Sequence, residues 1–435
     1  MKIFKPITLQ HREFDFLSDN SQECDDHCLF VRTTMNAQYH QQVKHYISED
    51  ELIKYFKLPP KIIAITGTNG KTTTASLIAH ILFDNGYKVA LLGTRGFFIN
   101  KQLKKQKGLT TPTILELYAL LEEAKDCDFC VMEVSSHAIV QNRIKGLQFA
   151  AKILTNITSD HLDFHQTLEE YIRVKNSFFD GSSLQIINAD DSNISKQISP
   201  KISYGIQNQA DIYASHIQTS PYIQAQIHTS QSTDLKLKMC GLHNLYNALA
   251  AIACVQSLSL IPLEKISQSL ASFEGVEGRM EILCTSPLIV VDFAHTHDGM
   301  EKILESFKDE KNVILFGAGG DRDKSKRPKM GKVAEKYGNK IYLTSDNPRS
   351  ENPQNILQEI SEGIQDKSKI VSINPNRLES IQQAIMELKE DENLFVLGKG
   401  DETYQIVGET KIPLDDREVI RAVLESQSYQ NLKGR

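Results

Sequence analysis

From residue 61 onward, short apolar runs alternate along most of the chain with segments whose apolar residues have helical spacing. Runs rich in Val, Ile and Leu are typical of strands that are buried on both faces of a sheet. Between several of these runs, apolar residues recur at every third or fourth position, as they do along one face of a helix. This rhythm predicts a mostly parallel sheet with helices on both faces. The strand-like runs are 61–66, 88–93, 129–134, 151–156 and 184–188.

The pattern changes twice in the second half of the chain. Residues 212–239 lose the helical spacing and alternate polar with apolar positions, which predicts a small antiparallel sheet attached to the main one. Residues 241–254 then predict a long buried helix. A second strand–helix series begins near Leu288. Its strands are predicted at 288–292, 312–316, 340–344, 370–373 and 393–397.

The first 58 residues have a weaker pattern, with a strand-like run at 28–31 and a helix-like stretch at 49–56. Two prolines at 59–60 mark the end of this segment, and a glycine-containing stretch at 273–278 marks a second boundary. We therefore predict an α/β protein of three domains. They are a small N-terminal α/β domain (1–58), a central parallel sheet with a small antiparallel sheet (59–279), and a C-terminal Rossmann-like domain (280–435).

The composition narrows the class of protein. With 435 residues the chain is long enough for about two to four domains, and 40% hydrophobic with 24% charged residues is typical of a soluble globular protein. A net charge of −6 argues against a nucleic-acid partner. The N-terminus has no signal-peptide pattern, and no run approaches the roughly 18 apolar residues of a membrane span. Seven cysteines, an odd number, indicate a reducing compartment, so we predict a cytoplasmic protein with no membrane partner.

Two cysteine pairs have spacings that occur in metal or redox sites. Cys24 and Cys28 flank His27 and could supply zinc ligands, but no second ligand pair stands at a suitable distance along the chain. Cys127 and Cys130 have redox spacing. Because they lead into an apolar run, the pattern favours the start of a buried strand for this second pair.

A glycine turn follows the first strand of the main series. The sequence Gly67-Thr-Asn-Gly70-Lys71-Thr72 stands between an apolar run and a helical pattern. Glycines allow backbone N–H groups to approach phosphate oxygens, the helix N-terminus and the lysine attract negative charge, and a threonine hydroxyl can hold Mg²⁺. The common form of this motif has its first glycine where this chain has Ile65. The shorter form still predicts a phosphate-binding loop, and hence a central domain of the P-loop ATPase type.

Reactive side chains follow other predicted strands. Glu133 ends one strand and could hold the Mg²⁺ of a bound nucleotide, although an exposed acid at a strand end is an equal alternative. Residues 158–165 contain two acids and two histidines, which suit metal or phosphate chemistry. The alternative for this segment is a helix-capping Asp160 with surface histidines. Lys175 lies in a helical pattern with apolar flanks, which favours a lysine whose stem packs on the surface while its ammonium reaches water.

Three segments with glycine or charged residues follow strands of the second series. Residues 317–327 combine a glycine turn with alternating charges, which favours a ligand-binding loop over a solvated charge run. Asp346-Asn-Pro-Arg349 could present an arginine that clamps a carboxylate with two hydrogen bonds. Gly398-Lys-Gly-Asp-Glu402 follows the last strand. From these residues alone the chain is an ATP-using enzyme, and a kinase, a ligase and a motor remain open.

The glycine turn and a series of further motifs resemble the Mur ligase family, the ATP-dependent amide-forming enzymes of peptidoglycan precursor synthesis. The resemblance extends from about residue 60 to residue 405. The motifs, in chain order, are Thr66-Gly-Thr-Asn-Gly-Lys-Thr-Thr73, Thr110-Thr-Pro112, Met132-Glu-Val-Ser-Ser-His137, Ser159-Asp-His-Leu-Asp-Phe-His165, Gly241-Leu-His-Asn-Leu-Tyr-Asn247, Gly278-Arg-Met-Glu281, Val291-Asp-Phe-Ala-His-Thr296, Gly319-Gly-Asp-Arg-Asp-Lys324 and Gly398-Lys-Gly400.

The set is most similar to the family members that add the third amino acid, and Asp346-Asn-Pro-Arg349 matches the form found where that amino acid is meso-2,6-diaminopimelate. The resemblance implies an ADP-forming ligase that adds diaminopimelate to UDP-N-acetylmuramoyl-L-alanyl-D-glutamate through an acyl phosphate. Members that add L-lysine usually lack the arginine, since lysine has no second carboxylate. The alternatives are a sister ligase that adds L-lysine or another amino acid, and a non-catalytic nucleotide-binding scaffold.

The resemblance also implies roles for individual residues, with ATP and Mg²⁺ as cofactors, small molecules as substrates and a monomeric protein. The catalytic residues would be Lys71, Glu133, His161 and Lys175, the last of them carried as a carbamate (N6-carboxylysine). The Mg²⁺ ligands would be Thr72, Glu133, His161 and Lys175. The ATP contacts would be Gly67, Thr68, Asn69, Gly70, Lys71, Thr72, Thr73, Asn247, Arg279 and His295. The muramoyl-dipeptide contacts would be Ser21, Thr110, Thr111, Ser135, Gln141 and Arg143, and the diaminopimelate contacts would be Arg322, Asp346, Asn347, Arg349, Gly398 and Glu402.

Three positions depart from the family pattern. The N-terminal domain, which binds the UDP-sugar in relatives, has Asn20-Ser21-Gln22 where they have an Asp-Ser-Arg turn. Asp401 stands in place of a common histidine, and Phe293 in place of a common tyrosine. Only the serine of the Asp-Ser-Arg turn is kept, as Ser21, so the resemblance leaves the other uridine contacts open.

Overall fold

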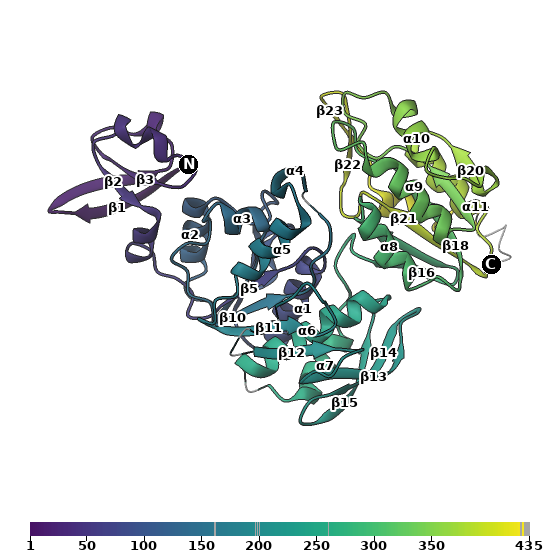
Figure 1. Ribbon diagram of the computed structural model, residues 1–435, viewed down its shortest axis with the longest axis horizontal. Helices are drawn as coiled ribbons and strands as arrows, with labels where there is room; N and C mark the ends of the chain where they lie inside the picture. The colour runs from purple at the N-terminus through teal and green to yellow at the C-terminus, as the bar shows by residue number, and fades with distance from the viewer. Residues whose placement is uncertain are drawn as a thin grey trace. The chain divides into compact units, whose positions relative to one another are not determined.

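The computed structural model of the chain describes residues 1–160, 162–195, 197, 199, 201–259, 261–426 and 429. They form two compact units, whose helices and strands are labelled in Figure 1. The three-domain division at residues 58 and 279 remains a prediction beside this two-unit division. The first unit comprises Met1–His216, Ala225–Leu235 and Tyr246–Ala271, and the second comprises Ile217–Gln224, Lys236–Leu245 and Ser272–Arg435.

A four-stranded sheet begins the first unit, in the order β1-β2-β3-β4. β1 and β2 are antiparallel, while β3 and β4 add to them in parallel. One face packs on helix α2, with Phe14 and Leu29 of the sheet in one buried cluster with Leu115 and Tyr118 of the helix. The elements are β1 (Lys2–Leu9), β2 (Arg12–Ser18), β3 (Cys28–Arg32), β4 (Tyr46–Ser48), α2 (Ile114–Glu123) and the 3-10 helices η1 (Ser21–Glu23), η2 (Ala37–Gln42) and η3 (Glu49–Lys54).

The helix predicted at 49–56 is wrong in type, because this segment forms the shorter 3-10 helix η3. Ser48 and Glu51 form a capping box at its start. The prolines at positions 59 and 60 follow closely, so the segment has no room for several α-helical turns.

An eleven-stranded sheet follows along the chain, in the order β15-β14-β13-β12-β11-β10-β5-β9-β6-β7-β8. Its strands are β5 (Ile62–Thr66), β6 (Val89–Gly93), β7 (Gly96–Ile99), β8 (Gln102–Lys105), β9 (Phe129–Glu133), β10 (Ala151–Leu154), β11 (Leu184–Asn188), β12 (Lys201–Gly205), β13 (Ile212–Gln218), β14 (Ile223–His228) and β15 (Ser232–Leu237). Its helices are α1 (Lys71–Asp84), α3 (Ser136–Val140), α4 (Leu162–His165), α5 (Leu168–Ser177), α6 (Leu242–Leu258) and α7 (Leu263–Ala271).

The strands from β12 to β6 run parallel to their neighbours, so their carboxyl ends meet at one edge of the sheet. Every residue of β5 and β9 is buried, as expected for strands that helices cover on both faces. On one face, Ile62 and Met132 share a cluster with Leu117 of α2 and Tyr171 of α5. This burial fixes the strand ends from which the candidate site is built.

A six-stranded sheet organises the second unit, in the order β16-β17-β21-β18-β19-β20. β16 is antiparallel to β17, and the other neighbours are parallel. The elements are β16 (Glu281–Thr285), β17 (Leu288–Asp292), β18 (Lys311–Phe316), β19 (Lys340–Leu343), β20 (Ile370–Ile373), β21 (Glu392–Leu397), the hairpin β22 (Tyr404–Val407) and β23 (Thr410–Pro413), α8 (His297–Glu305), α9 (Lys326–Tyr337), α10 (Pro353–Ser361), η4 (Lys367–Lys369), α11 (Arg377–Met386) and α12 (Asp416–Glu425).

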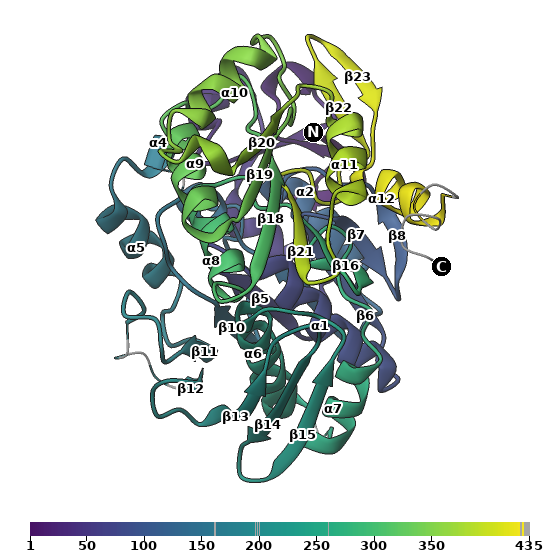
Figure 2. The same cartoon turned by 90° about the vertical axis from the view of Figure 1, so that its right-hand side faces the viewer.

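Alternate residues of these strands face opposite layers of helices. Ile314 and Phe395 belong to a cluster with α8, α9 and α10, whereas Val313 and Leu394 belong to a cluster with α11 and α12. Figure 2 shows the two groups of helices on opposite sides of the sheet. This doubly wound arrangement confirms the predicted α/β class for the second unit.

Each strand-like run of both predicted series is a strand. The pattern missed β1, β2, β4, β7, β8, β12, β16 and the hairpin β22–β23. β8 and β23 have only four residues each and are exposed along their whole length, so neither shows the apolar run or the alternation that marks a buried strand. Within the part of the chain that the structure describes, no helix is long and apolar enough to cross a membrane.

Candidate active site

The glycine turn between β5 and α1 is packed closely against neighbouring segments. Gly67 and Gly70 have φ angles of +148° and +82°. A Cβ atom on Gly67 would lie 1.9 Å from Thr155 Oγ1, and one on Gly70 would lie 2.2 Å from Asn247 Oδ1. Both positions therefore require glycine. The same contact places the predicted Asn247 against the loop, while Thr73 is buried in the first turn of α1.

The segment that follows β10, the strand beside β5, and helix α5 hold the loop in place. Thr68 Oγ1 donates to Thr158 O at 3.1 Å and lies 3.1 Å from the Tyr171 hydroxyl. Asn69 N donates to Asn156 Oδ1 at 3.0 Å. The loop conformation is thus fixed from outside as well as by its own glycines.

Two lysines converge on the carbonyl of Gly67. Lys71 Nζ donates to Gly67 O and to Thr68 O at 2.8 Å each. Lys175 Nζ, from α5, donates to the same Gly67 O at 3.0 Å and to Thr66 Oγ1 at 3.3 Å. Lys175 is only 1% exposed, so its interpretation as a surface lysine is wrong. Burial, and then the charge of Lys71, hold the pKa of Lys175 well below its ordinary value.

Glu133 is the last residue of β9 and is only 2% exposed, so the alternative of an exposed strand-end acid is wrong. Thr72 Oγ1 donates to Glu133 Oε2 at 3.1 Å. Thr94 donates twice, from its N–H to Oε1 at 2.9 Å and from its hydroxyl to Oε2 at 3.1 Å. Thr94 was not among the predicted site residues, although its place directly after β6, which ends in Gly93, was a usable signal.

The oxygen atoms of Thr72 and Glu133 are of the type that Mg²⁺ prefers, with phosphates and water normally completing its shell. The residues present therefore fit Mg²⁺. Among the described residues, no three Cys, His, Asp or Glu side chains form a group that could hold a metal ion by themselves. His161 lies outside the described residues. The carboxylate of Asp160 acts to raise the pKa of Lys175, so Asp160 itself lies near that lysine.

The structure also describes one other candidate histidine and the cysteines at positions 24 and 130. His165 is buried, with Nε2 at 2.9 Å from Ser136 Oγ and its ring packed on Tyr171, so it is not a surface histidine. Cys130 lies within β9 and is a buried free thiol, as the strand interpretation predicted. Cys24 is also a free thiol.

Four of the predicted dipeptide contacts lie around the carboxyl end of β9. Thr111 Oγ1 donates to Glu133 O and accepts from Ser135 N, both at 3.0 Å. Arg143 Nη1 donates to Thr111 O at 2.7 Å. Arg143 also donates to Gln141 Oε1 from Nε at 2.9 Å and from Nη2 at 2.5 Å. These residues form one connected polar group next to Glu133.

Thr110 joins this group through Thr94, since the two hydroxyl oxygens are 3.2 Å apart. Ser21 does not join it. Its hydroxyl, on η1, donates to Gln42 Oε1 at 3.1 Å, and none of the described contacts links it with the residues around β9.

In the second unit, Arg279 and His295 both contact one aromatic ring, that of Phe293. The Arg279 guanidinium lies 4.4 Å from the Phe293 ring centroid, and the His295 ring meets Phe293 edge-on at 4.9 Å. A Cβ atom on Gly278 would lie 2.0 Å from Asp401 N. The segment before Arg279 therefore packs on the turn that follows β21.

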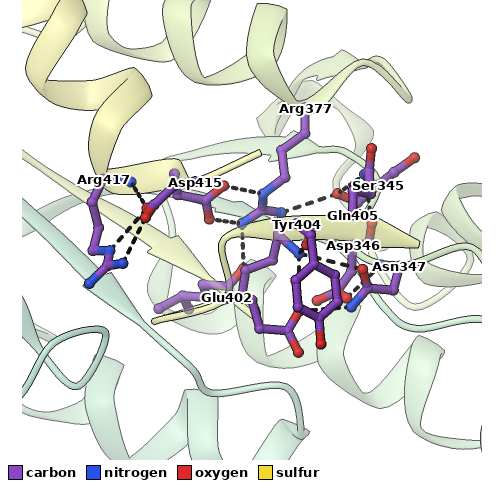
Figure 3. Close-up of polar contacts among 12 residues, drawn as sticks. Ser345, Asp346, Asn347, Arg377, Glu402, Tyr404, Gln405, Asp415 and Arg417 are labelled. Carbon is purple, nitrogen blue, oxygen red and sulfur yellow. Dashed lines mark hydrogen bonds and ion pairs between the residues drawn. The ribbon is translucent and has the colours of Figure 1, made fainter. Parts of the chain in front are cut away.

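The turns that follow β19 and β21 are joined by side chains (Figure 3). Asn347 Nδ2 donates to Glu402 Oε2 at 2.8 Å. Lys399 Nζ donates to Glu402 Oε2 at 3.0 Å and to Asn347 Oδ1 at 3.4 Å. A Cβ atom on Gly398 would lie 2.7 Å from Asp346 Oδ2. The structure thus brings four predicted residues together and adds Lys399, whose place inside the Gly-Lys-Gly motif was its only signal.

Two arginines approach the glycine turn that follows β18. Arg349 has a φ angle of +50°, and its Nη1 donates to Gly320 O at 2.8 Å. A Cβ atom on Gly319 would lie 3.0 Å from Arg349 Nη1 and 3.6 Å from Arg322 Cγ. Guanidinium groups bind carboxylates through paired N–H donors, so this turn can present both side chains to an acidic ligand.

Comparison with protein families and curated sequences agrees with this arrangement. Residues 65–255 match the model of the Mur ligase middle domain, and residues 278–400 match that of the Mur ligase, glutamate ligase domain. The UDP-N-acetylmuramoyl-L-alanyl-D-glutamate–2,6-diaminopimelate ligase of Wolinella succinogenes is 49% identical over 432 residues, 98% of each chain. The protein of the same name from Helicobacter pylori is 48% identical over 451 residues and spans 100% of both chains.

Solved structures give the same result. A structure of a UDP-N-acetylmuramoyl-L-alanyl-D-glutamate–2,6-diaminopimelate ligase matches with a TM-score of 0.68 and 27% identity over 94% of each chain. The MurF ligase of Thermotoga maritima, solved in complex with ADP, matches with a TM-score of 0.61 and 16% identity, covering 96% of this chain and 98% of that one. The second likeness shows a shared fold alone.

Proposed function

The chain belongs to the Mur ligase family, and we propose that it adds meso-2,6-diaminopimelate to UDP-N-acetylmuramoyl-L-alanyl-D-glutamate in a reaction driven by ATP. One amide bond forms, and ADP and phosphate are released, as a step of peptidoglycan precursor synthesis. Two relatives named for this activity are 49% and 48% identical over at least 98% of this chain. The observation that carries the choice of amino acid is Arg349, which stands with Arg322 beside the joined turns after β19 and β21.

The reaction begins when the D-glutamate carboxylate of the nucleotide-sugar dipeptide attacks the γ-phosphorus of ATP. The bond between the γ-phosphorus and the β-phosphate oxygen breaks, so that an acyl phosphate and ADP are formed. The backbone N–H groups of the turn at Gly67 and Gly70, the N-terminus of α1 and the Lys71 ammonium supply the positive potential that holds the phosphates. The amine of diaminopimelate then attacks the acyl carbon, and phosphate leaves. The protein contributes mainly charge neutralisation and alignment of three ligands.

Mg²⁺, held by Thr72, Glu133, His161 and the modified Lys175, would neutralise phosphate charge. The buried Lys175 supports the proposed carbamate, because CO₂ adds only to a neutral amine and the pKa of Lys175 is held well below its ordinary value. The addition releases one proton and converts the amine into an anionic N6-carboxylate. The contacts of Lys175 with Gly67 O and Thr66 Oγ1 keep this group beside the phosphate loop.

The proposed amino-acid site contains both signs of charge that diaminopimelate requires. The carboxylates of Asp346 and Glu402 suit an ammonium group, and the guanidinium groups of Arg322 and Arg349 suit carboxylates. Lysine would offer one carboxylate where diaminopimelate offers two. Arg349 is partly buried. With lysine bound it would lack the second carboxylate and lose a charge-assisted hydrogen bond, which supports discrimination against lysine.

The proposal keeps the three predicted domains with separate tasks. Residues 1–58 bind the UDP-sugar, residues 59–279 bind ATP, and residues 280–435 bind the amino acid. We also propose that the protein is a cytoplasmic monomer. The seven free thiols suit a reducing compartment.

The decisive experiment is a phosphate-release assay with ATP, Mg²⁺ and the muramoyl-dipeptide nucleotide, run in parallel with meso-diaminopimelate and with L-lysine. We expect turnover with diaminopimelate and at least tenfold lower kcat/KM with lysine, about 1.4 kcal/mol of discrimination. Equal or better turnover with lysine would establish the sister ligase instead. Absence of phosphate release with either amino acid would leave the nucleotide-binding scaffold.

A further inference from the structure

Arg377 and Asp416 form a fully enclosed ion pair in the second unit. Both side chains are 0% exposed. Arg377 Nε donates to Asp416 Oδ1 at 2.8 Å and Nη2 donates to Oδ2 at 2.6 Å. Figure 3 shows the Arg377 side chain near the centre of these polar contacts, between Asp415 and Ser345. Burial acts to lower the pKa of Arg377, but the nearby carboxylates, Asp416 first among them, raise it above its ordinary value.

The same guanidinium also binds two backbone carbonyls. Nη1 donates to Ser345 O at 3.3 Å, and Nη2 donates to Leu397 O at 3.1 Å. Leu397 ends β21, and Ser345 stands just beyond β19. Because β18 lies between these two strands, no backbone ladder connects them directly. Arg377 therefore links two strand ends that the sheet alone leaves separate.

Each of these carbonyls directly precedes a turn of the candidate amino-acid site. Ser345 leads into Asp346, and Leu397 leads into Gly398. The distance between the two strand ends thus sets the distance between the turns, where Asn347 and Glu402 meet at 2.8 Å. A change in that distance would separate the groups that receive the amino acid.

The hairpin that follows the second turn is tied to the first turn as well. Gln405 Nε2 donates to Asp346 O at 2.6 Å and to Ser345 O at 3.5 Å. Ile406 N donates to Asn347 Oδ1 at 2.9 Å. The two turns and β22 are therefore connected by hydrogen bonds, and Arg377 connects them to the ends of β19 and β21.

We propose that Arg377, held by Asp416, is a positioning residue that sets the spacing of the two turns and thereby the affinity for the amino-acid substrate. This inference rests on the proposed function. A buried ion pair contributes little net stability compared with an apolar pair of similar volume, so stability alone gives no reason for this one. The guanidinium fork directs its N–H donors along fixed lines, whereas a lysine ammonium is a point charge without that geometry.

The test uses the full chain with Arg377→Met and Asp416→Leu introduced together, which removes the tethers and leaves no unpaired buried charge. We expect the KM for diaminopimelate to rise by about tenfold to a hundredfold, the range that misplaced binding groups produce. The KM values for ATP and for the muramoyl-dipeptide nucleotide should change by less than about twofold, because the contacts described for Arg377 and Asp416 are all with residues next to the proposed amino-acid site. Thermal unfolding of each variant, followed by circular dichroism, reports whether it is folded.

Arg417→Met is the matched control, since Arg417 lies on α12 beside Asp416 and pairs with Asp415 instead. It should leave all three KM values unchanged. Arg377→Lys is the second variant, which keeps the charge, and it should also raise the KM for diaminopimelate.

An unchanged KM for diaminopimelate in either folded variant would overturn the positioning role. An equal rise in all three KM values, or loss of folding in both variants, would show that the pair serves the fold as a whole and would also overturn it. If the unaltered chain shows no turnover with diaminopimelate, the proposed function itself is wrong. This result is obtained without the variants, so it is distinct from a failure of the positioning role.

Discussion

The two candidate sites of the chain are built from different kinds of contact. In the first unit, charged side chains point at backbone carbonyls, and both Lys71 and Lys175 donate to Gly67 O. In the second unit, contacts between side chains join the turns after β19 and β21, and Glu402 accepts hydrogen bonds from both Asn347 and Lys399. One site concentrates positive charge around a short loop, whereas the other balances charges between separate segments.

This difference follows from the ligands that each site is proposed to bind. Phosphates are bound by several backbone N–H groups on one loop and by nearby cations, so a motif of a few residues describes most of the site. An amino acid with two ends needs groups of opposite charge at fixed separation. Such groups come from residues 319–322, 346–349 and 398–402, and they depend on supports such as Arg377 that belong to none of these segments.

The strongest test of the first site is Lys175→Ala, which removes the amine that the proposed carbamate requires. We expect kcat to fall by about a hundredfold to a thousandfold, the range for loss of one preorganised electrostatic group. Added short carboxylic acids should restore part of the phosphate release by replacing the carbamate.

Lys152→Met is the matched control for this prediction. Lys152 is a buried lysine of the same unit, but it donates to Phe178 O and Asp180 Oδ1 and not to the loop. Its replacement should lower stability without changing kcat of the folded protein. Full activity of Lys175→Ala would remove Lys175 from the catalytic group.

The strongest test of the second site is Arg349→Ala. We expect the KM for diaminopimelate to rise by about tenfold to a hundredfold, because a charge-assisted hydrogen bond contributes about 1.5–3 kcal/mol. The KM for ATP should not change, which separates the two sites in one experiment. Arg421→Ala, at an arginine that pairs with Glu418 and Glu281, is the control. Unchanged turnover of diaminopimelate by Arg349→Ala would contradict the assignment of this amino acid.

Much of the fold could be predicted because buried parallel strands appear in the sequence as continuous apolar runs. The apolar runs that became β5 and β9 are covered on both faces, so every position had to be apolar or strand-terminal. The predicted α/β class and family are confirmed. Strands with exposed faces, such as β8 and β23, do not show such apolar runs.

The candidate site was predictable where one short segment contains it. The loop from Gly67 to Thr72 was visible as a motif, but the burial of Lys175 was not, because helical spacing does not say what lies opposite a side chain. Arg377 and Asp416 are 39 positions apart, and neither stands in a motif. Pairings of this kind are set by the tertiary fold, so the sequence pattern alone could not reveal them.

The pH dependence of stability separates the two regions further. Hydrogen bonds from Arg327, and then from the N–H of Asp321, lower the pKa of Glu351 to about 2. Because this folded-state pKa lies below the unfolded value of about 4.3, Glu351 stabilises the second unit above that pH, and its contribution is lost as the pH falls towards 2. We expect Glu351→Gln to lower the free energy of unfolding by about 1 kcal/mol at pH 7 and by much less at pH 2, as measured by urea titration.

Glu362→Gln is the control for the pH measurement, since Glu362 is an exposed acid at the end of α10. It should have no effect at either pH. An equal loss of stability for Glu351→Gln at pH 7 and pH 2 would show that the Glu351 charge does not support the turn at Asp321.

The smallest expected effect concerns how the phosphate loop is held. The Tyr171 hydroxyl lies 3.1 Å from Thr68 Oγ1, so Tyr171→Phe removes one contact between α5 and the loop. We expect a loss of about 1 kcal/mol of stability, as for one hydrogen bond, and a rise in the KM for ATP of at most about fivefold, the same energy expressed as binding. Tyr118→Phe is the matched control, because the Tyr118 hydroxyl is also buried but donates to Lys145 O at 2.9 Å, away from the loop.

Tyr118→Phe should therefore lose similar stability without any change in the KM for ATP. If Tyr171→Phe behaves in the same way, the loop is held by its backbone and glycines alone, and the first site needs no side-chain support of the kind that Arg377 gives the second. If its KM for ATP rises while that of Tyr118→Phe does not, both sites depend on a residue outside their motifs. The difference between them would then be one of degree, set by how many separate segments each ligand must engage.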